Sequence, residues 1–494
     1  MPLPCFRRCL PPLARLSVAG LLGLAASGGA RAQAAPGLSL AEAVALAQTQ
    51  SVAGQQAATN QALGYWRWRG YQANYRPQLG LAGTLPNFSR VVVPVVQPDG
   101  TTDFRAVRIN NSSLALTLTQ NVGRTGGQVF VGSEVQRFDD FNGQLKRYNN
   151  QPFTLGFVQP LGLFNGLAWA RRTEPLRYQE SRRQYVEERE TVAQRVTELF
   201  FDLLLQQVNA AVAGQNVQAN AEQLRVGQEK HRLGRLSEND LLQLELNLLN
   251  AQQAGQQAQL AAETAALDLQ AYTSLPAVAP ALAVPGPAPH PAVAPEAALA
   301  QARQNRSTTL ALRRRLLEAE RDVALARGST GLQASLSATL GYVNQAPIFA
   351  DTYLALQNQQ QLRLAFALPL VDWGRRRATV RAAELARDQT QRAVAQETAT
   401  FEQAVRTQAA QLPRLAEQVA RAARADTLSR RRYDITQATY RAGRLSLTDL
   451  TLAAAAKDVA RRDYIAALRA AWVAHFRLRA LTLYDFENQQ LIEQ

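Results

Sequence analysis

The sequence has few of the side chains from which metal centres and covalent active sites are built. Its 494 residues include two cysteines, Cys5 and Cys9, and three histidines, His231, His290 and His475. Zinc sites and thiol nucleophiles draw on these residue types. The chain also carries no H-E-x-x-H, P-loop, G-x-G-x-x-G or G-x-S-x-G pattern. We therefore expect no cofactor, no metal, no catalytic residue and no enzyme activity, and we place His231 and His475 on solvated helix faces.

Lysine is also scarce, although the net charge is +15. Lys146, Lys230 and Lys457 are the only lysines, so the positive excess is nearly all arginine. The arginines are scattered along amphipathic segments without a recognition motif, which argues against a nucleic-acid partner. The charge suits anionic lipid head groups or anionic cargo instead.

Long apolar runs are missing except near the start. Arg7, Arg8 and Arg15 precede an apolar run over 16–26, and Ala30-Arg31-Ala32 follows it. This order is typical of a cleaved signal peptide, which we assign to 1–32. An uncleaved anchor is the alternative, but the run is shorter than the about 20 residues that span a bilayer. No later stretch predicts a transmembrane helix, so the exported chain is either soluble or a membrane β-barrel.

The clearest feature is an internal repeat. The stretch R-L-G-R-L-S-E-N-D from Arg232 matches R-A-G-R-L-S-L-T-D from Arg441, at an offset of 209. Phe157 and Pro160 match Phe366 and Pro369 at the same offset. The openings match at an offset of 254, through Glu42 and Glu296, so the first copy carries about 45 extra residues.

Each copy is predicted to contain a helix, strands, a very long helix, a turn and a last helix. We expect repeat 1 over 38–276, a proline-rich linker over 277–294, repeat 2 over 295–486 and a tail over 487–494. The expected helices are 39–75, 166–232 and 237–273 in repeat 1, and 296–328, 375–442 and 446–484 in repeat 2. Each long helix would measure about 100 Å. Val192, Val196, Leu199 and Leu203 have the spacing of a coiled-coil seam.

The predicted strands alternate between apolar and small or polar residues. Examples are 332–342 and 362–368 in the second copy, and 114–119 and 153–157 in the first. A period of two over about ten residues is typical of a membrane barrel, although a half-buried soluble sheet has the same alternation. Four tryptophans flank the predicted helix–strand junctions, as membrane-interface aromatics do. These are Trp66, Trp68, Trp169 and Trp373.

This duplicated order resembles the TolC family of outer-membrane efflux proteins, from about Leu38 to about Phe486. The resemblance implies a mainly α fold with a membrane β-barrel portion. Long coiled-coil-like helices would form an α-barrel, and the strands of a homotrimer would share one β-barrel. It also implies a passive exit duct for a tripartite efflux or type I secretion system in the outer membrane of a Gram-negative bacterium, projecting into the periplasm. The expected partners are a periplasmic adaptor, an inner-membrane pump and outer-membrane lipid.

The two R-x-G-R-L-S turns are the candidate functional tips. Glycine permits positive φ at a helix end, and Ser-x-x-Asp can cap the next helix, which is a sufficient structural reason for both turns. The resemblance adds adaptor contact at these turns and an entrance constriction at Asp240 and Asp449. The tip residues are Gly234, Arg235, Leu236, Ser237, Gly443, Arg444, Leu445 and Ser446.

Two departures from the family pattern stand out. Leu452 occupies the place of a second acidic ring, which puts a doubly acidic gate in doubt. The stretch from Gly123 to Val135 adds either a further hairpin or a long external loop, so the barrel would gain strands in the first case. A periplasmic coiled-coil scaffold or adaptor without a barrel is the alternative function, because it explains the helices but not the duplicated strands.

Overall fold

The computed structural model describes residues 38–162, 164–274, 282–289, 293–442 and 444–492. The expected signal peptide over 1–32 and the tip residue Gly443 lie outside these residues. The described residues from Leu38 onward belong to one compact unit.

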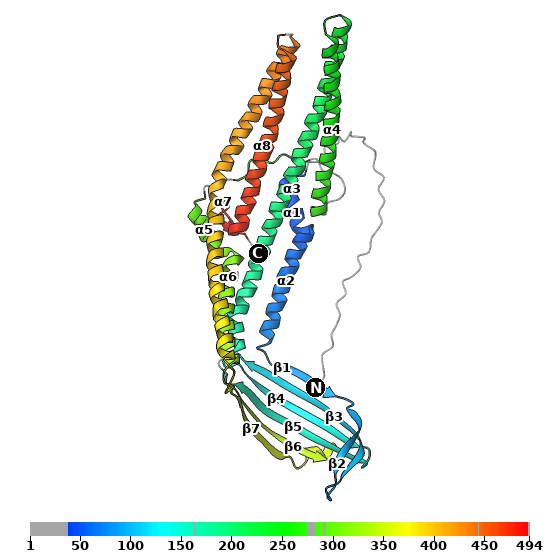
Figure 1. Cartoon of the computed structure of the whole chain (residues 1–494), viewed down its shortest axis with the longest axis vertical. Coiled ribbons are helices and arrows are strands. Elements are labelled where there is room, and N and C mark those ends of the chain that lie inside the picture. Colours follow the sequence, from blue (N-terminus) through cyan, green and yellow to red (C-terminus); the bar gives the residue numbers. More distant parts are fainter. Residues whose placement is uncertain (1–37, 163, 275–281, 290–292, 443, 493–494) are drawn as a thin grey trace, which may run out of the picture. The chain divides into compact units, whose positions relative to one another are not determined.

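Both halves of the chain fold into the same order of helices (Figure 1). The first half contains α1 (Leu40–Gln50), α2 (Val52–Ala73), α3 (Gly166–Arg232) and α4 (Glu238–Thr273). The second half contains α5 (Pro295–Asn305), α6 (Ser307–Ser329), α7 (Arg375–Arg441) and α8 (Leu447–Thr482). Helices α3 and α7 each have 67 residues, α4 and α8 each have 36, and both pairs are offset by 209. The predicted mainly α fold with two very long helices is therefore confirmed.

The single opening helix expected in each half is wrong, because each is broken into two. Ser51 and Arg306 have extended backbones, with ψ near 151° and 146°, between α1 and α2 and between α5 and α6. The Ser51 hydroxyl accepts a hydrogen bond from the Gly54 amide at 3.0 Å and so caps α2. The two breaks are 255 residues apart, and the buried Ala43 matches the buried Ala298 at the same spacing. The offset of 254 taken from Glu42 and Glu296 is thus one residue short.

The core lies where helices of the two halves meet. Val192, Val196, Leu199 and Leu203 of α3 are all buried, which confirms the predicted seam. They belong to a cluster with residues of α1, α4 and α8. A second cluster joins α5, α7 and α8. Burial of these side chains, each contributing about 1.5–3 kcal/mol, holds the long helices side by side.

The linker is extended but packs against the helices. Within its described part, Ala283 donates a backbone hydrogen bond to Leu38 at 3.2 Å. The indole Nε1 of Trp472 in α8 donates to the carbonyl of Gly286 at 2.9 Å. The fifth tryptophan therefore fixes the linker rather than a helix–strand junction.

One antiparallel sheet carries the strands of both halves (Figure 1). The first half supplies β1 (Gln78–Thr84), β2 (Phe88–Val96), β3 (Thr102–Val122), β4 (Gly127–Asp140) and β5 (Leu145–Pro160). The second half supplies β6 (Gln333–Ala346) and β7 (Gln357–Ala367), which are joined through the short 3-10 helix η1 (Ala350–Tyr353). Strands β8 (Tyr484–Asp485) and β9 (Gln490–Leu491) form a separate two-stranded sheet. The order in the main sheet is β1-β3-β4-β5-β6-β7, and β2 pairs with the N-terminal half of β3, over Thr102–Asn110.

The extra segment of the first half is a pair of strands and not an external loop. The offset between the halves falls from 255 before the strands to 209 after them, so the first half holds 46 more residues there. Strands β3 and β4, paired from Ile109–Asp140 to Val122–Gly127, account for most of them. Strands β1 and β2 lie one after the other along the same side of β3 and so share one position. The seven strands of the sheet therefore occupy six positions, of which the second half supplies two.

The strand register places the apolar residues on one face. Directly paired residues run in a row across five strands: Leu79, Leu118, Val131, Leu155 and Leu340. The neighbouring row on the other face consists of Gly80, Thr117, Gly132, Thr154 and Gly341. Paired residues of an antiparallel sheet point to the same side, so one face is apolar and the other is small and polar. Among the described helices, none is long and apolar enough to cross a membrane.

Candidate helical tips and gate

The first tip is the turn between α3 and α4, and its geometry follows from one glycine. Gly234 has φ +69°. Its amide donates to the carbonyl of His231 at 2.8 Å, and the Arg235 amide donates to Lys230 at 2.8 Å. These two bonds form a Schellman motif, which satisfies the last carbonyls of α3. His231 also contacts the carbonyl of Leu236 through Nδ1, at 2.9 Å.

The second tip, between α7 and α8, repeats the bond of the arginine amide 209 residues later. The Arg444 amide donates to the carbonyl of Thr439 at 3.1 Å, as Arg235 does to Lys230. Both arginine side chains are exposed, and so is Leu445, while Leu236 is half-buried. The turns therefore present two exposed arginines at the ends of the long helices.

The serines and aspartates of both tips are tied into helix caps. The Asp240 amide donates to Ser237 Oγ at 3.1 Å, and the Asp449 amide donates to Ser446 Oγ at 3.2 Å. Each serine hydroxyl also lies 2.6 Å from the Oδ2 of its aspartate. At the second tip the Ser446 amide donates to Asp449 at 3.3 Å, which completes a capping box. Both carboxylates are exposed, so each can cap its helix and still present charge to solvent.

Leu452, one turn beyond Asp449, is 60 % exposed. An apolar side chain here cannot attract cations, so Asp449 carries the negative charge of this turn alone. A role of Asp240 and Asp449 in a constriction stays a prediction.

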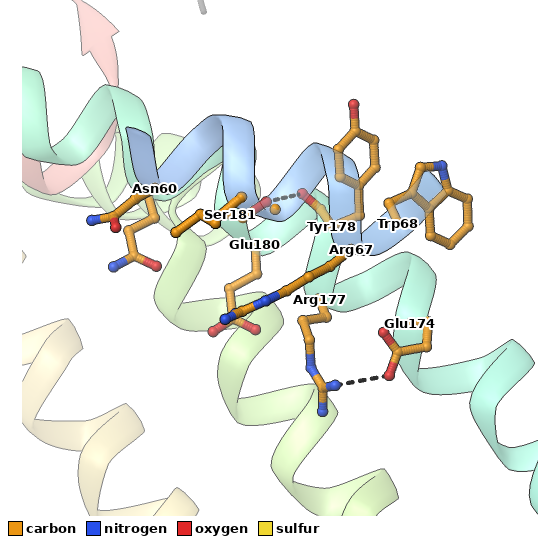
Figure 2. Close-up of a pocket in the computed structure, with 11 residues that line it drawn as sticks. Asn60, Arg67, Trp68, Glu174, Arg177, Tyr178, Glu180 and Ser181 are labelled. Atoms are coloured by element: carbon orange, nitrogen blue, oxygen red, sulfur yellow. Dashed lines mark hydrogen bonds and ion pairs between the residues drawn. The ribbon is translucent and has the colours of Figure 1, made fainter. Parts of the chain in front are cut away.

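The four tryptophans assigned to a membrane interface lie near the helix–sheet junctions but differ in their surroundings. Trp68 of α2 stacks on Tyr178 of α3 at 5.5 Å between ring centroids, with 5° between the ring planes (Figure 2). Trp169 lies under the Arg172 guanidinium at 5.0 Å. Trp66 is exposed, and Trp373 is 96 % exposed at a backbone with φ +51°. The membrane role of all four stays a prediction, and for Trp68 packing between helices is a sufficient reason.

A cavity of about 330 Å³ lies between α2 and α3 beside Trp68 (Figure 2). Its wall includes the ion pair of Arg177 with Glu174 at 2.8 Å. Arg177 also pairs with Glu318 of α6 at 2.8 Å, and Arg314 of α6 pairs with Glu180 of α3 at 2.7 Å. These pairs join the two halves just above the sheet. We assign them a structural role, because each charge of the network has its partner inside it.

His475 is not on a solvated helix face, and that expectation is wrong. It is buried in α8 beside Arg479, which pairs with Glu190 of α3 at 2.9 Å and with Asp485 at 3.1 Å. Burial, and secondarily the charge of Arg479, lower the pKa of His475 to about 4. His475 is therefore a neutral core residue at neutral pH.

Helix α4 carries an exposed leucine stripe that was not predicted from the sequence. Leu242, Leu246, Leu249, Leu260 and Leu267 are between 50 % and 65 % exposed. Their spacing follows alternating steps of four and three, with Gln253, Gln256 and Glu263 in the intervening places. That is the spacing of a coiled-coil seam, and it would have been detectable from the sequence. We call these five residues the α4 leucine stripe.

Comparison with known proteins agrees with this architecture. Residues 114–274 match the family described as outer membrane efflux protein. The CmeC outer membrane channel of Campylobacter jejuni shares 15 % identity, with 91 % of this chain and 88 % of that chain covered and a TM-score of 0.65. The outer membrane protein VceC of Vibrio cholerae shares 14 %, with 90 % and 96 % covered and a TM-score of 0.62. The MtrE outer membrane channel of Neisseria gonorrhoeae shares 14 %, with 90 % and 88 % covered and a TM-score of 0.58.

No curated protein matches the sequence. The solved structures show that the chain has the fold of outer-membrane channels. Together with the family match over 114–274, they confirm the resemblance to the TolC-like outer-membrane efflux proteins.

Proposed function

We propose that this chain, an outer-membrane efflux protein of the TolC-like kind, forms the passive exit duct of an efflux or type I secretion system. Three copies enclose one channel across the outer membrane and the periplasm. An adaptor docks at the helical tips and an inner-membrane pump supplies the energy. The chain itself performs no chemistry on the cargo.

The observation that carries the membrane assignment is the exposed apolar face of the sheet. Leu79, Leu118, Leu155 and Leu340, four members of the apolar row, remain 40 % to 68 % exposed. Leaving a continuous apolar face in water costs about 25 cal/mol for each Å². Hydrocarbon on that side and water on the polar side satisfy both faces, as in membrane barrels.

The α4 leucine stripe supports association with further copies. The residues of α8 that lie 209 positions beyond Leu249 and Leu260 are Asp458 and Arg469. Both face α3: Asp458 accepts a hydrogen bond from Asn216 at 3.3 Å, and Arg469 pairs with Asp202 at 3.1 Å. The part of the stripe around Leu249 and Leu260 is therefore the counterpart of α8 residues that contact α3.

The helix that would cover the stripe is α7, the counterpart of α3. Within the described part of one chain, α4 makes its substantial contacts with α3 and α1, not with α7. The α7 helix of a second copy fits this place, and repeating the contact closes a ring by cyclic symmetry. The number of copies, three, comes from the family resemblance.

The rival function, a periplasmic scaffold without a barrel, is tested by extraction. Membranes from cells expressing the full chain are washed with high salt and with carbonate, and then treated with detergent. We expect the protein to stay with the membranes until detergent is added, and then to have the mass of a trimer. Release by salt or carbonate as a monomer would refute the duct.

A further inference from the structure

The sheet ends in two free edges within the described residues. Strands β1 and β2 pair with the same side of β3 and form one edge, strand β7 pairs with β6 and forms the other, and no described strand lies beyond either edge. Unpaired backbone groups cost several kcal/mol each in hydrocarbon. If the sheet lies in the membrane, as the proposed function requires, these edges must find partners.

The chain already contains one joint between its two halves, and this joint provides a template. Strand β5 ends the first half of the sheet and pairs antiparallel with β6, which begins the second half. Val158 lies opposite Ser337, and Gly156 lies opposite Thr339.

Both strands of this joint have counterparts at the free edges. Strand β7 is the counterpart of β5 at an offset of 209, through Leu155–Leu364, Phe157–Phe366 and Pro160–Pro369. Strand β1 is the counterpart of β6 at an offset of 255. Four identities support that alignment: Gln78–Gln333, Leu81–Leu336, Thr84–Thr339 and Leu85–Leu340.

We infer that β7 of one copy pairs antiparallel with β1 of the next copy in the register of the internal joint. This inference rests on the proposed self-association and specifies its contact. The register places Ala367 opposite Ala82, the counterparts of Val158 and Ser337, and Ala365 opposite Thr84. These two pairs and the one between them are the pairs that lie within both strands, because β1 ends at Thr84 and β7 ends at Ala367. The rest of β7 lies opposite residues 85–92, which include the start of β2.

The two faces of the sheet provide an independent check. Leu81 of β1 shares the face of the apolar row, and so do Leu362 and Phe366 of β7. The inferred register places Phe366 opposite Gly83 and keeps the apolar residues of both strands on one side. If the counterparts in β1 and β6 were 254 residues apart, the pairing of β7 with β1 would shift by one residue. The apolar side chains of β7 would then lie on the polar face of the sheet. Such a slip is strongly disfavoured where one face is buried.

The exposed Trp373 fits the same joint. Its counterpart in the first half is Phe164, which lies so close to Gly328 of α6 that a Cβ there would collide with it. The counterpart of Gly328 is Ala73, at the end of α2. The joint brings Trp373 to the end of α2 in the neighbouring copy, where the Cβ of Ala73 requires residue 373 to lie farther from the helix than Phe164 lies from Gly328. An indole that is 96 % exposed in one chain would be covered there.

The inferred joint fixes the number of strands in the ring. Each copy supplies six strand positions, so three copies supply three times six, or eighteen. Two halves that both resembled the second half would supply four positions per copy and twelve in all. Barrel diameter grows roughly linearly with strand number, and barrels of about 16–18 strands leave an aqueous channel. The inserted strands β3 and β4 therefore widen the outer opening relative to the helical part.

Disulfide trapping tests the register in the full chain. The two cysteines, Cys5 and Cys9, lie in the expected signal peptide, so introduced cysteines have no competitor in the mature protein. Ala82→Cys with Ala367→Cys should give a covalent ring under mild oxidation, seen as a trimer on a non-reducing gel. Thr84→Cys with Ala365→Cys is the second pair. Leu81→Cys with Ala367→Cys is the control, because its side chains point to opposite faces and a disulfide needs Cβ atoms about 3.5–4.5 Å apart.

We expect at least about tenfold more covalent product from the two matched pairs than from the control, since the geometry of a disulfide is narrow. Trimers without cross-linking at either pair would overturn the register and leave the proposed duct intact. A monomer that washes off the membrane would refute the duct as well. An image of the cross-linked trimer that showed a barrel of twelve strands would overturn the inferred eighteen-stranded barrel.

Discussion

Gly227 of α3 lies directly against Leu244 of α4, and the side chain of Leu244 fills the space that a Cβ at residue 227 would need. In the second half the counterparts are Thr436 and Ala453. The large side chain thus stands on the last helix in one hairpin and on the long helix in the other. Both solutions bring the two helices close together just before the tip.

This exchange of sizes predicts the effect of swapping one partner. Gly227→Thr should overpack the first hairpin and cost about 1–3 kcal/mol. Adding Leu244→Ala should recover most of that loss, although Leu244→Ala alone leaves a cavity and costs about 2–5 kcal/mol. Limited proteolysis at the turn between α3 and α4 measures how much more often this hairpin unfolds locally. Gly214→Thr is the control, because nothing surrounds that exposed glycine of the same helix. Additive losses in the double variant would show that the two residues are not coupled.

The second tip allows charge and capping to be separated at Asp449. Asp449→Ala removes both the carboxylate and its bonds to Ser446, whereas Ser446→Ala removes the cap, at a cost of about 0.5–2 kcal/mol, and keeps the charge. If Asp449 lines the entrance, conductance in planar bilayers should rise and block by divalent cations should weaken for Asp449→Ala alone. Equal effects of the two variants would assign the residue to the cap only, and no effect of either would remove it from the gate.

The sequence was sufficient for features that rest on periodicity and failed where one residue decides. The ends of α3 and α7 follow from a long helical pattern between strand and turn, and the predicted bounds agree within one residue. The breaks at Ser51 and Arg306 were missed because neither residue is a strong helix breaker. Ser51 caps α2, but Arg306 makes no side-chain cap of α6 that could signal the second break. His475 was misplaced because a single polar residue on a helix does not reveal which neighbours cover it. The pairing of β3 with β4 was left open, since a valine-rich stretch suits a hairpin or a loop until its partner is known.

The arginines of the tips are expected to dock the adaptor. Reversing both charges, Arg235→Glu with Arg444→Glu, should weaken binding of the cognate adaptor by about tenfold or more, because like charges placed across an interface are repulsive. Pull-down or surface binding with the purified adaptor measures the change. Arg105→Glu with Arg108→Glu, two exposed arginines of β3, is the control of equal charge change far along the chain from both turns. Unchanged binding of the double variant would mean that the adaptor contacts another surface.

The buried His475 should make the helical core sensitive to acid. Its pKa is lowered to about 4 in the folded state by burial and by Arg479, against 6.5 when unfolded, while Asp485 opposes the shift. The unfolded chain therefore binds the extra proton between these two values. Stability is complete above about pH 6.5 and falls as the pH drops toward 4, by a total on the order of 3 kcal/mol.

Melting of the detergent-solubilised protein between pH 7.5 and 4.5 tests this dependence. His475→Gln cannot be protonated, so its melting temperature should fall less over the same range than that of the wild type. The difference between the two slopes isolates the histidine from the many carboxylates that titrate in both proteins. Parallel slopes would show that His475 is hydrated in the assembled protein.

The α4 leucine stripe should hold neighbouring copies together. Burying one leucine contributes about 1.5–3 kcal/mol, and a carboxylate in its place would have to be desolvated without a partner. Leu249→Asp with Leu260→Asp should therefore convert the trimer to smaller species, measured by mass in detergent. Gln252→Asp adds a charge to the same helix at an exposed position outside the stripe, and should leave the trimer unchanged. Dissociation of both variants would reflect charge on α4 in general, whereas a stable trimer in both would place the stripe outside the contact between copies.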